Sequence, residues 1–152
     1  MSWFCYTDGA CKAGDDAPGG WGYLIKGPGS EILEGHGSAT KTLAKVMEYR
    51  AVAEALAVAP EAVALTVFSD NQSLIENLQK HLGTWAARGF TKVDPTIVES
   101  VKAIAAAIAA RRLTVEWRWV RAHNGNAGNE RADALAAQGA REAKAALKEA
   151  KR

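Results

Sequence analysis

The order of secondary-structure patterns along the chain is the feature that most limits its fold. Three short segments rich in β-favouring residues come first, and glycine-bearing loops separate them. We predict strands from Trp3 to Asp8, from Trp21 to Ile25 and from Glu31 to Gly37. Successive strands joined in this way predict an antiparallel meander.

Strand and helix patterns alternate after the meander. Apolar residues recur at helical spacing from about Leu43 to Ala57, and a short apolar run from Ala62 to Phe68 predicts a buried strand. The remaining predicted elements are helices over 71–81, 83–88 and 94–112, a strand over 114–120 and a final helix from about 129. In the third of these helices, Asp94 is the expected N-cap and Pro95 the first helical residue. This order predicts an α/β fold with a five-stranded mixed sheet flanked by helices.

The length of 152 residues suits one domain, which we expect to cover 1–138, with an exposed helical extension over 139–152. No apolar run is long enough to span a bilayer, and the first residues do not form a secretory signal. Cys5 and Cys11 lie too far apart along a predicted strand to form a disulfide. We therefore expect reduced thiols in a monomeric, cytoplasmic protein with no membrane partner.

Charge is distributed unevenly, although the net charge is only +2. Residues 1–79 carry five Lys/Arg and ten Asp/Glu, whereas residues 80–121 carry eight Lys/Arg and three Asp/Glu. An acidic part followed by a basic part fits a carboxylate site beside a surface that binds a phosphate backbone. An ordinary soluble surface is the alternative interpretation.

Four acidic residues stand where the predicted fold could gather them. Asp8 and Asp70 each end an apolar strand, Glu48 lies within an apolar helical face, and Asp133 lies about one turn into the final helix. Taken singly, these acids could cap turns, face solvent or complement a helix dipole. Taken together, they fit a site for divalent cations, which prefer oxygen ligands and can activate water for phosphodiester hydrolysis.

Seven short stretches with these acids in order resemble type 1 ribonuclease H, from residue 3 to about residue 138. The matching stretches are Tyr6-Thr7-Asp8-Gly9-Ala10-Cys11, Gly19-Gly20-Trp21-Gly22, Met47-Glu48-Tyr49-Arg50-Ala51, Ser69-Asp70-Asn71-Gln72, Trp85-Ala86-Ala87-Arg88-Gly89-Phe90, Val115-Glu116-Trp117-Arg118-Trp119-Val120, and His123-Asn124-Gly125 through Asn129-Glu130-Arg131-Ala132-Asp133. The resemblance implies a ribonuclease H-like fold, which agrees with the order of elements derived above.

The resemblance also implies roles for individual residues. Asp8, Glu48, Asp70 and Asp133 match the family's metal-binding acids, and His123 matches a loop histidine that assists proton transfer or product release. The other matches are expected to touch substrate: the backbone of Gly9, Ala10 and Cys11 at RNA 2′-hydroxyls, Gln72 with its neighbour Asn71 in the minor groove, and Trp85 on a protrusion that grips DNA. A core tryptophan is an equal alternative for Trp85.

The implied reaction is endonucleolytic cleavage of the RNA strand of RNA–DNA hybrids. Two Mg²⁺ ions, or Mn²⁺, would serve it, leaving 5′-phosphate and 3′-hydroxyl ends. The chain departs from the family at Leu43, Ala44 and Lys45, where a threonine and two asparagines usually contact the hybrid, and its protrusion carries few cations. These departures keep alternatives open: a structure-selective DNA nuclease on the same fold, a non-catalytic hybrid-binding module, or a chain whose partner supplies the missing contacts with nucleic acid.

Overall fold

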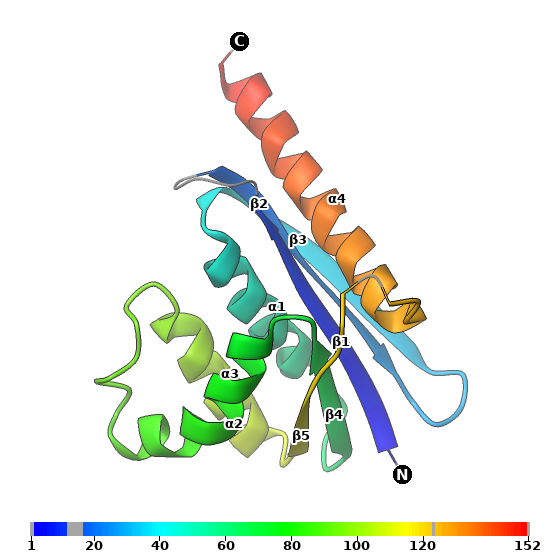
Figure 1. The fold of residues 1–152 in the computed structure, drawn as a ribbon, viewed down its shortest axis with the longest axis vertical. Helices are drawn as coiled ribbons and strands as arrows, with labels where there is room; N and C mark the ends of the chain where they lie inside the picture. Colours follow the sequence, from blue (N-terminus) through cyan, green and yellow to red (C-terminus); the bar gives the residue numbers. More distant parts are fainter. Residues whose placement is uncertain (1, 12–16, 123, 152) are drawn as a thin grey trace.

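Five strands form one mixed sheet in the order β3-β2-β1-β4-β5 (Figure 1). The computed structural model describes residues 2–11, 17–122 and 124–151. The strands are β1 (Ser2–Cys11), β2 (Ala17–Lys26), β3 (Ile32–Thr42), β4 (Ala64–Ser69) and β5 (Thr114–Trp119). β1, β2 and β3 pair antiparallel, and β4 and β5 continue the sheet in parallel with β1. The predicted meander and mixed sheet are therefore confirmed.

Two strands of the meander, β1 and β3, are longer than the strands predicted from the sequence. β1 continues three residues past Asp8 to Cys11, which pairs with Gly19, and β3 continues past Gly37 to Thr42. Backbone hydrogen bonds between neighbouring strands hold these ends. Backbone pairing of this kind does not depend on side chains, so small and polar residues can extend a strand. Such residues show no apolar pattern from which the extension could be predicted.

Four helices complete the fold: α1 (Ala44–Val58), α2 (Gln72–Ala87), α3 (Val98–Ala110) and α4 (Ala127–Ala150). Two predictions about helices were wrong. α2 is one helix and runs straight through Gly83, because a single glycine costs only about 1 kcal/mol inside a helix. α3 begins at Val98, since Asp94 caps a preceding turn by accepting a hydrogen bond from the Thr96 N–H at 2.9 Å.

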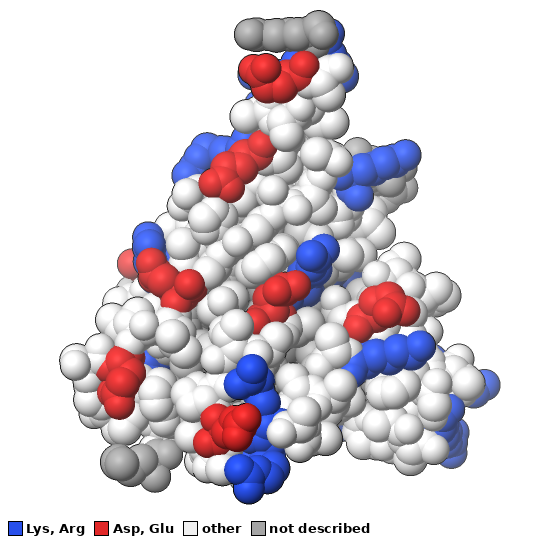
Figure 2. Space-filling view, turned by 180° about the vertical axis from the view of Figure 1, so that it is seen from behind, with Lys and Arg blue, Asp and Glu red and all other residues white. Residues whose placement is uncertain are grey.

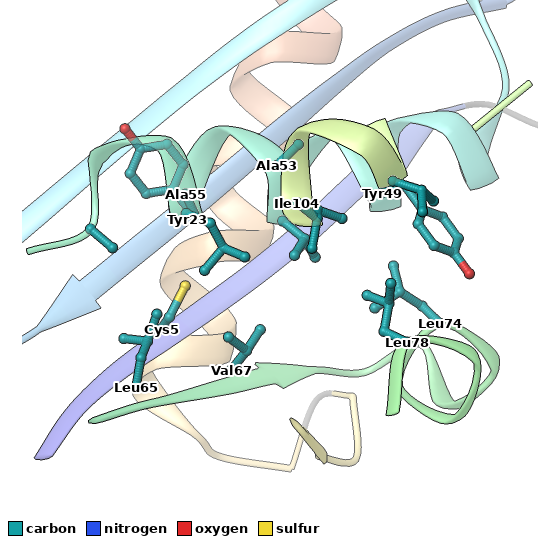
Figure 3. Packing of buried hydrophobic residues seen from close by; sticks show 14 of the residues in the cluster. Cys5, Tyr23, Tyr49, Ala53, Ala55, Leu65, Val67, Leu74, Leu78 and Ile104 are labelled. Carbon is teal, nitrogen blue, oxygen red and sulfur yellow. The ribbon is translucent and has the colours of Figure 1, made fainter. Parts of the chain in front are cut away.

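The core fills the space between one face of the sheet and α1, α2 and α3 (Figure 3). Cys5, Leu65 and Val67 of the sheet and Leu56 of α1 are at most 1% exposed, as is Ile104 of α3. Burial raises the pKa of the Cys5 thiol to about 12. Cys5 and Cys11 are both free thiols, as expected.

α4 lies on the opposite face of the sheet, where small residues let it approach closely. A Cβ on Gly22 of β2 would lie 2.6 Å from the Ala136 nitrogen of α4, so only glycine fits there. Ion pairs join α4 to β3: Arg131 Nη2 with Glu34 Oε1 at 2.7 Å, and His36 Nε2 with Glu142 Oε2 at 3.1 Å. α4 then continues past the end of the sheet (Figure 1). None of the helices in the described ranges combines the length and apolar character needed to cross a membrane.

Candidate active site

Asp8 and Asp70 lie side by side because β1 and β4 are parallel neighbours. Tyr6 of β1 pairs with Phe68 of β4, and each acid follows two residues later. Side chains at the carboxyl ends of adjacent parallel strands meet at one edge of the sheet, where ligand sites of open α/β sheets commonly lie. This register brings together the two acids that the sequence placed at strand ends.

Gly9 allows Glu48 to join them. A Cβ at Gly9 would lie 2.6 Å from the Met47 carbonyl carbon, so the glycine lets the β1 backbone pack directly against α1. The Gly9 N–H donates to Glu48 Oε1 at 3.2 Å and to Asp8 Oδ1 at 2.9 Å. One backbone amide therefore holds two of the acids toward the same point.

The carboxylates converge into one cluster. One oxygen each from Asp8, Glu48 and Asp70 lie within 4.8 Å of one another. Asp133 of α4 lies near this group, and its side chain adds to the rise in the pKa of Asp8, after burial and the charge of Glu48. Three of the four acids that the sequence analysis selected, from β1, α1 and the end of β4, therefore meet at one point, and Asp133 of α4 lies beside them.

Burial and mutual repulsion make this cluster hard to ionise fully. Burial, followed by the charge of Glu48, raises the pKa of Asp8 to about 10. Burial, followed by the charge of Asp70, raises the pKa of Glu48 to about 7. Burial and the neighbouring acids both favour the neutral form of these carboxyls, and a cation bound among them would favour the ionised form.

The donor set fits a hard divalent cation. Glu48 Oε2 is buried and makes no hydrogen bond within the described part of the chain. A buried carboxylate oxygen left without a donor is costly unless a ligand meets it. Several converging carboxylate oxygens are the ligands that Mg²⁺, Mn²⁺ and Ca²⁺ prefer.

The other residues predicted to form the site stand in different settings. Asn71 caps α2, its Oδ1 accepting from the Leu74 N–H at 3.0 Å, and exposed Gln72 donates to Glu76 at 3.2 Å. Ala10 and Cys11 extend β1 beyond Asp8 and are half-buried. Trp85 is partly buried against the core, and its ring centroid lies 5.5 Å from that of His81. His123, like Asp15 and Asp16, is outside the described residues.

Trp119 is a neighbour of the site that the sequence analysis did not assign. Its indole Nε1–H donates to the Asp70 carbonyl oxygen at 3.2 Å, and the side chain is 43% exposed. The register explains this position, because Trp119 pairs with Ser69, the residue before Asp70. Only knowledge that β5 neighbours β4 could have drawn attention to it.

Comparison with known proteins decides the family. A family model described as RNase H matches residues 2–141, which is most of the chain. The chain belongs to the ribonuclease H family. Curated members named "Ribonuclease H" from Polaromonas naphthalenivorans and Bordetella pertussis are each 40% identical to it, over 137 and 135 residues. Each alignment covers 88% of this chain, and 84% and 86% of the relative.

Solved ribonuclease H structures share the fold. LC9-RNase H1, described as a type 1 enzyme with the type 2 active-site motif, superposes with a TM-score of 0.74 at 27% identity, covering 91% of this chain and 72% of that one. The N-terminal ribonuclease H domain of a Mycobacterium tuberculosis protein gives a TM-score of 0.75 at 21% identity, covering 96% and 98%. This ribonuclease H is therefore an enzyme whose acidic cluster lies in the family fold.

Proposed function

We propose that the chain hydrolyses the RNA strand of RNA–DNA hybrids, using divalent cations held by Asp8, Glu48, Asp70 and Asp133. The observation that carries this proposal is the convergence of three carboxylates within 4.8 Å around a buried oxygen without a hydrogen-bond donor. A solved relative of the same fold, LC11-RNase H1, is described as a complex with an RNA/DNA hybrid, which supports the choice of substrate.

The proposed cofactor is a pair of Mg²⁺ ions, with Mn²⁺ as a substitute. When bound, such ions neutralise charge on the scissile phosphate and lower the pKa of a water molecule. The protein's task is to hold its carboxylates fixed in place, and a bound cation would favour their ionised form. The Gly9 N–H holds Asp8 and Glu48, and the hydrogen bond from Trp119 fixes the backbone at Asp70.

The proposed products are 5′-phosphate and 3′-hydroxyl ends, and His123 is proposed to assist proton transfer or product release. Selection of RNA would depend on 2′-hydroxyls in the wide minor groove of the hybrid. We assign those contacts to the backbone of Gly9, Ala10 and Cys11, which continues along β1 directly from Asp8. We further propose a monomer in the cytoplasm, in keeping with free thiols at Cys5 and Cys11.

A DNA nuclease on the same fold is the second candidate. The specific observation in its favour is at the start of α1, where Ala44 and Lys45 replace residues expected to contact the hybrid. Lys45 Nζ forms an ion pair with Asp94 Oδ2 at 2.8 Å, so its charge is directed toward the turn before α3.

Cleavage of matched substrates separates these functions. Labelled 24-base-pair RNA–DNA hybrid, duplex DNA and duplex RNA of one sequence would be incubated with the protein, with Mg²⁺ or with a chelator. We expect Mg²⁺-dependent cleavage of the hybrid's RNA strand alone. Cleavage of duplex DNA in preference to the hybrid would favour the second candidate, and binding without cleavage would indicate a non-catalytic module.

A further inference from the structure

One flank of α4 carries a row of exposed cations. Lys144, Lys148 and Lys151 are all exposed and recur at spacings of four and three residues, which places them on one side of a helix. Arg141 lies at the margin of the same side. We call Lys144, Lys148 and Lys151 the cation row.

The cation row lies on the same side of α4 as Asp133. At 3.6 residues per turn, Lys151 follows Asp133 by about five full turns, and Lys144 lies within about 20° of the same direction. The other flank of α4 faces β3, because Arg131 and Glu142 form their ion pairs with residues of that strand. The row therefore continues the flank from which Asp133 reaches the acidic cluster.

A hollow separates the beginning of this row from the sheet. It has a volume of about 220 Å³ and is lined by Pro18, Ala140, Arg141 and Lys144. Pro18 precedes Gly19, which pairs with Cys11 at the end of β1. The hollow thus adjoins the strand whose backbone we assign to the RNA contacts, and two of its four lining residues are cationic.

The cation row differs from the rear face of the molecule in how its charges are arranged. On the rear face, acidic and basic side chains are interspersed over the described part of the surface (Figure 2). Along the α4 extension they separate by flank, since Glu142 and Glu149 lie on the side opposite Asp133. A row of one sign on the flank of the catalytic site is complementary to a phosphate backbone.

We propose that the cation row binds the backbone phosphates of the nucleic-acid duplex on one side of the cut, an inference that rests on the proposed function. Lys144, Lys148 and Lys151 follow Asp133 along the helix axis by about 16, 22 and 27 Å at 1.5 Å per residue. For a duplex that runs parallel to α4, at about 3.4 Å per base pair, the row meets phosphates roughly five to eight base pairs from the scissile bond. The cation row contacts the duplex at a place separate from the α2–α3 segment.

The length of the hybrid provides the test. An 8-base-pair hybrid cut at its centre ends before the cation row, whereas a 24-base-pair hybrid extends past it. The test variant is Lys144→Gln with Lys148→Gln. The matched control, Lys26→Gln with Arg112→Gln, removes the same charge at the sheet end where β1 and β5 begin. Circular dichroism verifies that both fold.

Affinity is measured by fluorescence anisotropy in an Asp70→Asn background, from 50 to 300 mM salt. The test variant is expected to bind the 24-base-pair hybrid about 10- to 60-fold more weakly at 0.1 M salt, with a salt slope lower by about 2. Its affinity for the 8-base-pair hybrid and the control's affinities should match those of the parent.

Three results would overturn the proposal: unchanged affinity of the test variant for the long hybrid, an equal loss with the control, or an equal loss on the short hybrid. Weaker binding only to vesicles of anionic lipid would assign the row to membranes and overturn it as well. Cleavage is measured separately on otherwise wild-type protein. If no hybrid is cut, the proposed function fails while anisotropy still reports on the cation row.

Discussion

Replacing Asp8 with asparagine should stabilise the metal-free protein at neutral pH while abolishing cleavage. The pKa of Asp8 is raised from its ordinary value of 3.8 to about 10, because the carboxyl is buried among other acids. A raised carboxyl pKa contributes stability that is fully present below pH 3.8 and is lost as pH rises toward 10. At pH 7 the loss approaches about 4 kcal/mol, from 1.36 kcal/mol per pH unit over the interval between 3.8 and 7.

Asparagine removes this loss, because it is neutral and can donate a hydrogen bond to its acidic neighbours. Part of this loss of stability is shared with Glu48, because the same cluster raises the pKa of Glu48 to about 7. We therefore expect Asp8→Asn to raise the free energy of unfolding by about 2–4 kcal/mol at pH 7, and to change it little at pH 4. For a domain of this size, each 1 kcal/mol raises the melting temperature by roughly 2–4 °C.

Urea titration with a chelator at pH 4, 5.5, 7 and 8 provides the assay, with Glu76→Gln, at an exposed position of α2, as a surface control. Addition of 10 mM Mg²⁺ should stabilise the wild type, because an ion that binds the folded state shifts unfolding by mass action, and should stabilise Asp8→Asn less. An Asp8→Asn protein less stable than wild type at pH 7, or a difference independent of pH, would refute the reasoning.

Substitutions at three further positions test how the site is held. Gly9→Ala places a Cβ 2.6 Å from the Met47 carbonyl carbon. We expect it to lower the free energy of unfolding, measured by urea denaturation, by about 1–3 kcal/mol and to slow hybrid cleavage at least tenfold. Unchanged cleavage would count against the packing argument. Asn71→Ala removes the N-cap of α2 and should lower the free energy of unfolding by about 1 kcal/mol, whereas Asn71→Asp, which retains the acceptor, should not. Trp119→Phe removes the hydrogen bond to the Asp70 carbonyl; we expect slower single-turnover cleavage with near-normal hybrid affinity, and an unchanged rate would remove Trp119 from the site.

Much of the fold could be predicted because local pattern and global pairing agree. The meander follows from apolar segments between glycine turns, and the central strands follow from buried runs that end in Asp8 and Asp70. The errors occur where backbone pairing or a local turn outweighs side-chain pattern. β1 extends to Cys11 through its ladder with β2, and Asp94 caps a turn rather than a helix.

Three of the four acids selected from the sequence form one group in the structure, but the geometry of that group could not be predicted. Glu48 reaches Asp8 because Gly9 lets α1 approach β1, a contact that no spacing rule encodes. Asp133 lies beside these acids because glycines on β2 let α4 lie close to the sheet. Trp119 was missed for the same reason, since its position follows from the register of β4 and β5.

The rate of hybrid cleavage by Asp70→Asn is the most direct measure of whether the carboxylate cluster performs the chemistry. Single-turnover cleavage of a labelled hybrid would be compared with wild type in Mg²⁺ and in chelator, with hybrid affinity measured alongside. We expect cleavage by wild type only with Mg²⁺, and at least a hundredfold loss in Asp70→Asn with affinity kept within a few-fold. Near-normal cleavage by Asp70→Asn, or by wild type in chelator, would contradict a carboxylate-held metal site.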